Sequence, residues 1–458
     1  MSGISLQLRR LLSPGTLGST VTAYLYAGVI SAGPLVLSIV GILLVGLLSL
    51  SAVQRPEQLV QFQVSVTYLI AVSLIVTGLV QLAFTRYVSD RVFERQLDQI
   101  LSSYHAISLL TTAVTGLMGV LISWAYFDGL SLVYRLLMVM AFVILSNTWV
   151  ATTFLASIKQ YGAILLAFFL GYGLTVLGAV WFAQHGLNGL LAGFVAGQAI
   201  LLMVLNGSIH RRFRSTHYVS WQMLDYRRAY PILIAVGFLF NLGVWLDKFM
   251  FWFAPTGANI IGPLRASVIY DIPIFISYLC IIPGIAVFLL RMETDFADHY
   301  NDYYGAVRDG GTLDDIRRSR DEMVYSARAA LYEILKIQTV VALLVYGFGD
   351  RLLEYIGISP LYLPLLRIDV VAASLQIVFL GVLNIFFYLD KRRLVLVLTS
   401  LFVVLNGTLT WTTLELGPSA YGYGFVVALL ITVVLGLYLL DRHFEALEYD
   451  TYMAQGKG

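Results

Sequence analysis

Residues 20–50 read TVTAYLYAGVISAGPLVLSIVGILLVGLLSL, a run without a charged side chain. As a helix that rises about 1.5 Å per residue, this run is longer than the roughly 30 Å hydrocarbon core of a bilayer. The apolar part of a cleaved signal peptide has only about 7–15 residues, so we expect a retained first transmembrane helix. The pair Gly33-Pro34 near its middle is a candidate site for a bend, because proline removes a helical hydrogen bond.

Similar apolar runs recur along the whole chain. The predicted spans are 20–50, 58–84, 105–125, 132–156, 161–184, 189–209, 229–254, 264–290, 329–347, 360–389, 394–414 and 421–440. The composition agrees with this pattern, because 59% of the residues are hydrophobic and 12% are charged, with a mean hydropathy of +0.81. Soluble domains have about 45–50% apolar and about 25% charged residues. The sequence therefore predicts an all-α polytopic membrane protein with about twelve transmembrane helices.

Lysine and arginine residues are distributed unevenly between the two ends of these spans. If the N-terminus is inside, 22 of the 29 basic residues fall in the inner loops and tails. The others, on the outer side, in outer helix halves or at a boundary, are Arg55, Arg135, Lys248, Arg265, Lys336, Arg351 and Arg367. An excess of positive charge marks the cytoplasmic side of a membrane protein, so we expect both termini in the cytoplasm.

The arginine-rich segment 210–228 separates six predicted spans from six. We expect a cytoplasmic amphipathic segment at 1–19, an N-lobe at 20–209, the basic linker 210–228, a C-lobe at 229–441 and a cytoplasmic tail at 442–458. Two halves of equal orientation are an arrangement in which transporters alternate access around a central site. Pro231 opens span seven much as Gly33-Pro34 marks span one. Chance placement of prolines explains this equally well, since the halves share little sequence.

The longest polar connection, 291–328, contains nine acidic residues and six arginines. Gly310-Gly311 divides it, and Thr312 followed by Asp315 is the pattern of a helix capping box. Apolar residues then recur at helical spacing: Ile316, Met323, Ala327, Ala330, Leu331 and Ile334. We expect a cytoplasmic helical hairpin between transmembrane helices 8 and 9, which is either a solvated connector or a docking platform for a cytosolic partner. The candidate docking residues are Arg317, Arg318 and Arg320.

Ionisable side chains inside the apolar spans are the strongest candidates for function, because a charge at the bilayer centre costs about 2.5–3.5 kcal/mol even on lenient scales. They are Arg135, Asp247, Lys248, Arg265, Asp271, Arg367 and Asp369, all in the outer half under the expected topology. Their four positive and three negative charges nearly cancel. This favours a coupling site or a neutral substrate over a pyrophosphate-linked lipid, which needs an excess of cations. Alternatively, the charges pair to hold helices together, and the arginines extend to the membrane surface.

An aromatic stripe follows one face of span seven. Its residues recur at three- or four-residue spacing: Phe238, Asn241, Trp245, Phe249 and Trp252. Aromatic rings stack on the C–H faces of sugars, but such a stripe is also typical of lipid-facing packing. Both interpretations stay open. Further polar candidates are Asn147 in span four, Tyr270 beside Asp271, and Asn406 in span eleven.

Several motifs of enzymes and cofactor sites are missing from the sequence. It has no G-x-x-x-x-G-K-[ST] phosphate loop, no D-x-D triad and only one cysteine, Cys280. The six histidines are scattered without the spacing of metal ligands. We therefore expect a transporter rather than an enzyme, with no catalytic residue, cofactor, metal site or nucleic-acid partner.

Six short blocks closely resemble the PelG family, the membrane proteins of the Pel exopolysaccharide system. They are YAGVISAGP at 26–34, LDKF at 246–249, GPLRAS at 262–267, YDIP at 270–273, RMETDF at 291–296 and LYEILKIQ at 331–338. The resemblance covers essentially the full length. It implies a bacterial inner-membrane protein of the MOP flippase superfamily, related in architecture to MATE exporters. It also implies transport of Pel, a biofilm polymer of galactosamine and N-acetylgalactosamine, from cytoplasm to periplasm.

The same resemblance implies a multi-subunit export complex in the lipid bilayer. The expected partners are a PelF-like glycosyltransferase that makes the polymer, a PelD-like receptor of cyclic di-GMP and a PelE-like membrane protein. The family offers no catalytic residues to transfer to this chain. Two other functions remain open. The first is a membrane scaffold that recruits a cytosolic glycosyltransferase through 291–328, and the second is a cation-coupled, MATE-like exporter of small molecules.

Overall fold

A computed structural model of the 458-residue chain describes residues 16–50, 53, 55–96, 98–225 and 230–453. Most of the expected N-terminal segment, Arg227 and Arg228 of the linker, and the end of the tail lie outside the described residues. The chain forms two compact units. We call Gly33–Val268 the middle unit, and Met1–Ala32 together with Ile269–Gly458 the terminal unit.

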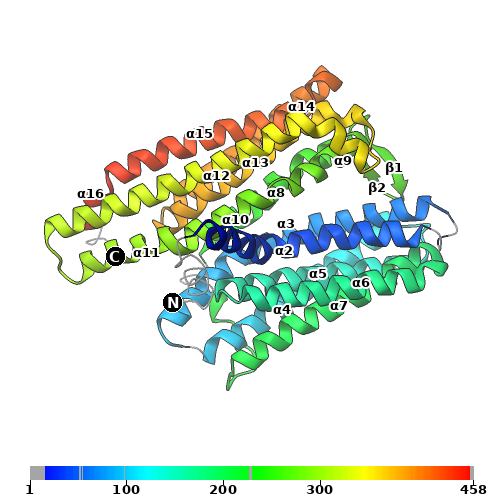
Figure 1. Ribbon diagram of the computed structural model, residues 1–458. Coiled ribbons are helices and arrows are strands. Elements are labelled where there is room, and N and C mark those ends of the chain that lie inside the picture. The colour runs from blue at the N-terminus through cyan, green and yellow to red at the C-terminus, as the bar shows by residue number, and fades with distance from the viewer. Residues whose placement is uncertain (1–15, 51–52, 54, 97, 226–229, 454–458) are drawn as a thin grey trace. The chain divides into compact units, whose positions relative to one another are not determined.

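The middle unit is a helical bundle with one β-ribbon (Figure 1). Its elements are the end of α2 (Leu17–Ser49), α3 (Glu57–Phe93), α4 (Asp98–Tyr126), α5 (Leu132–Ser157), α6 (Tyr161–Phe182), η1 (Ala183–His185), α7 (Gly186–Arg212), η2 (Gln222–Leu224), α8 (Pro231–Phe253), β1 (Ala258–Ile261) and β2 (Leu264–Ala266). Helix α3 packs along α8 and α5, α5 contacts α4 and α7, and α6 lies along α7. Buried side chains such as Phe62, Tyr134 and Phe194 form the core between them.

The terminal unit is built from helices alone among the described residues. Its elements are the start of α2, then α9 (Val268–Leu279), α10 (Ile282–Arg291), the π-helical turn η3 (Met292–Phe296), α11 (Ala297–Arg308), α12 (Leu313–Tyr355), η4 (Pro360–Tyr362), α13 (Leu363–Tyr388), α14 (Arg392–Leu416), η5 (Pro418–Ala420), α15 (Tyr423–Glu445) and α16 (Leu447–Met453). Helix α13 packs on α12 and α15, and α15 lies along α14. A smaller apolar core joins α9, α12 and α13 through Ile276, Val345 and Leu366.

Eleven helical segments of the described chain are long and apolar enough to cross a membrane. One of them, Tyr161–Arg212, has 52 residues and would reach about 80 Å as a single helix. The chain turns back within it at η1 and at Gly186, whose φ of +66° is accessible to glycine. It therefore forms two helices, α6 and α7, that pack against each other. The prediction of an all-α membrane protein with about twelve transmembrane helices is confirmed.

Helices α3 and α8 approach each other closely where Gly78 and Gly237 meet. A Cβ atom added at Gly237 would lie 2.2 Å from the carbonyl oxygen of Gly78, so the absence of side chains lets the two backbones touch. Before the first turn of α8, the Tyr230 hydroxyl donates to the Asp90 carboxylate of α3. Burial, and then this bond, raises the pKa of the Tyr230 phenol, which therefore stays a donor at neutral pH. These contacts fix the helix that carries four of the predicted site residues, Asn241, Trp245, Asp247 and Lys248.

The predicted eighth span, 264–290, is wrong at its start and interrupted in its middle. Leu264–Ala266 form strand β2, which pairs with β1 across a turn at Gly262-Pro263. The helical part then divides into α9 and α10. Pro283 at the start of α10 has no N–H to continue the hydrogen-bond ladder of α9. Hydropathy, which sums residues over a window, does not detect such a break.

Gln338 of α12 lies against the break between α9 and α10. Its fully buried amide donates to the carbonyl oxygen of Ile281 at 3.2 Å and accepts from the Ser374 hydroxyl at 3.1 Å. A Cβ atom added at Gly284 would lie 2.2 Å from the Gln338 Nε2 atom. Irregular backbone inside a membrane protein needs such protein partners, because lipid offers no hydrogen bonds.

The predicted helical hairpin at 291–328 is confirmed as α11 and the first part of α12, which lie side by side (Figure 1). Gly310, with a φ of +74°, makes the turn. The Thr312 hydroxyl accepts from the Asp315 backbone N–H at 3.2 Å, as the capping pattern predicts. Helix α12 then continues for 43 residues, about 65 Å. The hairpin arm and the ninth span are therefore one continuous helix rather than two elements.

The six-helix lobes expected at 20–209 and 229–441 stay a prediction. The compact units have other boundaries, because α8 packs along α3 in the middle unit and α2 passes from one unit to the other between Ala32 and Gly33. This change of unit lies next to Pro34, the residue for which the sequence predicts a bend.

Candidate functional site

Helix α8 carries a buried ion pair in the middle unit. Asp247 is 0% and Lys248 is 2% exposed. The Lys248 Nζ atom lies 3.1 Å from Oδ2 and 3.3 Å from Oδ1 of Asp247, and it donates to the carbonyl oxygen of Val244 at 2.8 Å. An ammonium group has three N–H donors, and acceptors on its own helix meet them. The pair therefore adds no net charge to the interior of this unit.

An aromatic cluster lies along the same helix and is completed by Tyr68 of α3. The Tyr68 ring is 4.5 Å from that of Trp252 and 6.0 Å from that of Phe249, between centroids. The rings of Trp245 and Trp252 are 6.4 Å apart. Helical spacing in the sequence identifies the stripe on α8 but not Tyr68, because Tyr68 lies on another helix and no local spacing connects it to the stripe.

Tyr68 also connects this cluster to the β-ribbon. Its hydroxyl donates to the carbonyl oxygen of Arg265 at 3.0 Å and lies 3.3 Å from the Arg265 backbone N–H. The Arg265 guanidinium donates to the carbonyl oxygen of Gly257 at 2.7 Å. The backbone of the predicted site residue Arg265 is thus held by Tyr68 of α3. Its guanidinium hydrogen-bonds to the loop between α8 and β1.

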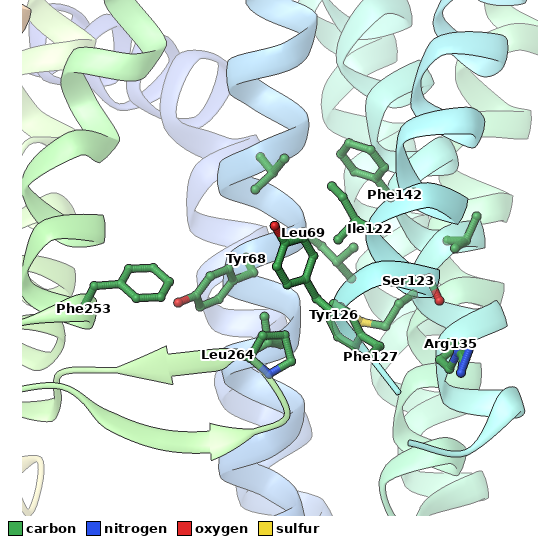
Figure 2. A pocket seen from close by; sticks show the side chains of 15 residues that line it. Tyr68, Leu69, Ile122, Ser123, Tyr126, Phe127, Arg135, Phe142, Phe253 and Leu264 are labelled. Carbon is green, nitrogen blue, oxygen red and sulfur yellow. The ribbon is translucent and has the colours of Figure 1, made fainter. Parts of the chain in front are cut away.

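A cavity of about 330 Å³ opens next to Tyr68, between α3, α4, α5 and the ribbon. Figure 2 shows the rings of Tyr68, Tyr126 and Phe127 at this cavity, with Leu264 of the ribbon at its edge. Its lining is almost entirely apolar, and Arg135 is its one charged residue. The Arg135 guanidinium pairs with Asp128 at 3.5 Å. Such a surface suits an apolar or ring-shaped group rather than a phosphate.

Two predicted amide side chains form hydrogen bonds within or between helices of the middle unit. Asn147 of α5 donates to the Thr112 hydroxyl of α4 at 2.9 Å and to the carbonyl oxygen of Val143 at 3.0 Å. Asn241 of α8 donates to the carbonyl oxygen of Gly237 at 2.9 Å, beside the crossing with α3. These bonds satisfy polar groups that lipid cannot satisfy.

The remaining predicted residues belong to the terminal unit. Tyr270 of α9 and Asp369 of α13 are fully buried, and Asp271 is half-buried. The Arg367 guanidinium of α13 donates to the carbonyl oxygen of Tyr346 at 2.8 Å and lies over the ring of the same residue. The seven ionisable residues that lie inside the predicted spans therefore divide between the two units. Those of the middle unit are Arg135, Asp247, Lys248 and Arg265, and those of the terminal unit are Asp271, Arg367 and Asp369.

A second polar cluster in the terminal unit joins two of the PelG-like blocks. Arg291 makes a bidentate contact with Glu333, with its Nε atom 2.6 Å and its Nη2 atom 2.7 Å from the carboxylate oxygens. Asp295 pairs with the same guanidinium, and the Tyr24 hydroxyl of α2 donates to Glu333 at 3.4 Å. This cluster ties α10 and the start of α2 to α12. The polar blocks 291–296 and 331–338 thus meet in the fold.

The three arginines proposed for partner docking differ in their surroundings. Arg320 pairs with Asp321 at 2.7 Å and with Glu448 of α16, and Arg317 is 3.6 Å from Glu448. The Arg318 side chain is 81% exposed and contacts only Glu322 of its own helix among the described ion pairs. Helix α16 therefore occupies one face of the arm, and Arg318 points away from it.

Comparison with known proteins identifies both a family and a fold. The family model described as "PelG: Putative exopolysaccharide Exporter (EPS-E)" matches residues 1–452. No curated protein matches the chain. Solved structures of transporters share its fold.

An outward-facing multidrug resistance MATE family transporter of the MOP superfamily is 15% identical, with a TM-score of 0.66 over 92% of this chain and 96% of that chain. A MOP superfamily transporter from Pyrococcus furiosus is 14% identical, with the same score and coverage. A MATE structure in the bent conformation is 14% identical, with a TM-score of 0.63 over 98% of this chain and 99% of that chain. At these identities the likeness shows the fold alone.

Proposed function

The chain belongs to the PelG family of exopolysaccharide exporters, and we propose that its cargo is the Pel polymer of N-acetylgalactosamine and galactosamine. In this proposal it is the inner-membrane subunit that passes the polymer from cytoplasm to periplasm, with both of its termini in the cytoplasm. A PelF-like glycosyltransferase supplies the polymer, and PelD-like and PelE-like proteins complete the complex. The chain itself transports and does not polymerise.

The observation that carries this proposal is the combination of a self-compensated charge pair with an aromatic cluster in the middle unit. Asp247 and Lys248 neutralise each other, while Tyr68, Phe249 and Trp252 lie ring to ring beside them. Aromatic rings present apolar faces that stack on the C–H faces of sugar rings. A largely uncharged sugar chain is therefore better matched to this surface than a pyrophosphate-linked lipid, which needs paired cations.

Alanine substitutions at Trp245, Asp247 and Asp271, which we propose to lie along the path of the polymer, test this function. We expect Trp245→Ala to lower polymer export about three- to tenfold, since an aromatic contact contributes about 0.5–1.5 kcal/mol. Asp247→Ala and Asp271→Ala are tested beside it. Export is measured as cell-surface polymer per unit of membrane-inserted protein. Trp181→Ala is the matched control, because Trp181 of α6 is 77% exposed. Unchanged export in all three variants at normal protein levels would place the path elsewhere.

The scaffold function has one structural observation in its favour, the long arm formed by α11 and α12. Because Arg317 and Arg320 contact α16, Arg318 is the most accessible of the docking candidates. Charge reversal by Arg318→Glu should abolish transferase recruitment if the arm is the docking platform. Fusing the transferase to the variant should then restore export. A MATE-like small-molecule exporter would instead show gradient-driven drug efflux in vesicles without polymer synthesis.

A further inference from the structure

Two histidines that are 105 residues apart in sequence meet at neighbouring helix ends in the middle unit. His105 lies near the start of α4, and His210 lies in the last turn of α7. Their Nε2 atoms are 2.9 Å apart, and their ring centroids are 5.0 Å apart. The centroid separation exceeds the nitrogen separation by nearly two ring radii, so the imidazoles meet almost head-on through their Nε2 atoms.

The other ring nitrogens determine where the hydrogens lie. His105 Nδ1 is 2.8 Å from the carbonyl oxygen of Tyr218, and His210 Nδ1 is 2.7 Å from that of Asn206. A carbonyl oxygen only accepts, so each Nδ1 carries a hydrogen. A neutral imidazole has one hydrogen, and both Nε2 atoms would then direct lone pairs at each other across 2.9 Å. One added proton changes this repulsion into an N–H···N hydrogen bond.

We propose that His105 and His210 form a proton-binding site, in which a single shared proton fastens α4 to α7. A shared metal ion fits the geometry less well. Zn–N bonds are about 2.0–2.1 Å, so two head-on imidazoles around a metal need their nitrogens about 4 Å apart. The pair is partly exposed to solvent, so protons have access to it.

The hydrogen bond between His105 and His210 matters for the packing of α4 against α7, because few other contacts join these two helices. Helix α4 packs mainly on α5 and α3. One side-chain bridge connects it to α7, in which the Tyr104 hydroxyl donates to Asn206. A backbone bond connects it to the segment after α7, in which the Ser220 N–H donates to the carbonyl oxygen of Ser102. The histidine pair is the second side-chain bridge described between α4 and α7, and its strength depends on one proton.

The charged and titratable groups around the pair come from three elements. Tyr104 of α4 and Tyr218 of the 213–220 segment have rings 6.1 Å and 5.9 Å from that of His105. Arg211 and Arg212 follow His210 in the last turn of α7. The arginines oppose a further positive charge, whereas the carbonyl end of the α7 helix dipole favours it. No carboxylate in the described part of the chain is hydrogen-bonded to either ring.

The proton-bound bridge stabilises the fold at low pH and is lost as pH rises. We therefore compare unfolding temperatures of the full chain in detergent at pH 6 and pH 8.5. His105→Leu removes the bridge and also, at every pH, the bond from His105 Nδ1 to the Tyr218 carbonyl oxygen. The difference in unfolding temperature between wild type and this variant should therefore be about 2 °C larger at pH 6 than at pH 8.5. His105→Gln supplies a permanent N–H donor and should make the bridge independent of pH.

His443→Gln is the matched control, because His443 also lies in the last turn of its helix and contacts a backbone carbonyl four residues earlier. It should leave the pH profile of wild type unchanged. A difference between wild type and His105→Leu that is the same at both pH values would overturn the proposal. So would a fall in the wild-type unfolding temperature on adding EDTA at constant pH, since a metal would then hold the pair.

Wild-type protein also allows a test without substitutions. Deuterium exchange at the C2 position of histidine, followed by mass spectrometry, reports the protonation of each ring. The proposal expects His105 and His210 to take up one proton between them over the range in which the bridge forms. Independent uptake of a full proton by each ring would contradict it.

Discussion

Replacing Lys248 with methionine is expected to destabilise the protein by about 3–5 kcal/mol, because the buried Asp247 carboxylate then loses its cation. Both side chains are essentially inaccessible, so water cannot replace the ammonium group. Methionine keeps much of the apolar stem of lysine, which limits the loss of packing. The measurement is the free energy of unfolding in detergent, or the surviving folded fraction after heating.

The double variant Asp247→Asn, Lys248→Met separates charge from packing. It removes both charges, and we expect it to recover most of the lost stability, since replacing a whole buried pair is often neutral. Additive losses from the two substitutions would mean that the pair is not energetically coupled. The double variant also tests function. If it folds normally but no longer exports polymer, the charges of Asp247 and Lys248 are required for transport rather than for folding.

Gly237→Val is expected to have the second large effect, at about 3 kcal/mol or more, because overpacking forces backbone shifts. The added Cβ would lie 2.2 Å from the Gly78 carbonyl oxygen, so α3 and α8 must move apart. The unfolding temperature and the yield of folded protein measure the loss. Gly173→Val in α6 is the control, because a Cβ there has nothing within 4 Å. Equal losses at both positions would show that helix propensity, not the crossing, decides the result.

Much of the fold could be predicted from the sequence, because each transmembrane helix is a local property of its own residues. Length and hydropathy predict α3, α5 and α13 without knowledge of their neighbours. The hairpin at 291–328 could also be predicted, because Gly310 and the Thr312 cap act within a few residues. Strand β2 and the break before α10 could not, since both lie inside the predicted span 264–290, whose average hydropathy stays high.

The candidate site could be predicted only in part, because its contacts join distant residues. The stripe on α8 follows from helical spacing, but its partner Tyr68 lies on α3 and becomes visible only when α3 and α8 pack. The division of the seven charges between two units has the same cause. The pair His105 and His210 is the clearest contact that the sequence could not predict. The two residues look scattered in the sequence and meet only through the packing of α4 and α7.

Delivery of polymer into vesicles tests the central claim most directly. The wild-type chain is reconstituted with the transferase and its membrane partners, sugar nucleotide is added outside, and an added glycoside hydrolase digests all exposed polymer. We expect hydrolase-resistant polymer in the lumen, and none in vesicles that lack this chain. Active polymer synthesis with all product accessible to the hydrolase would contradict the account.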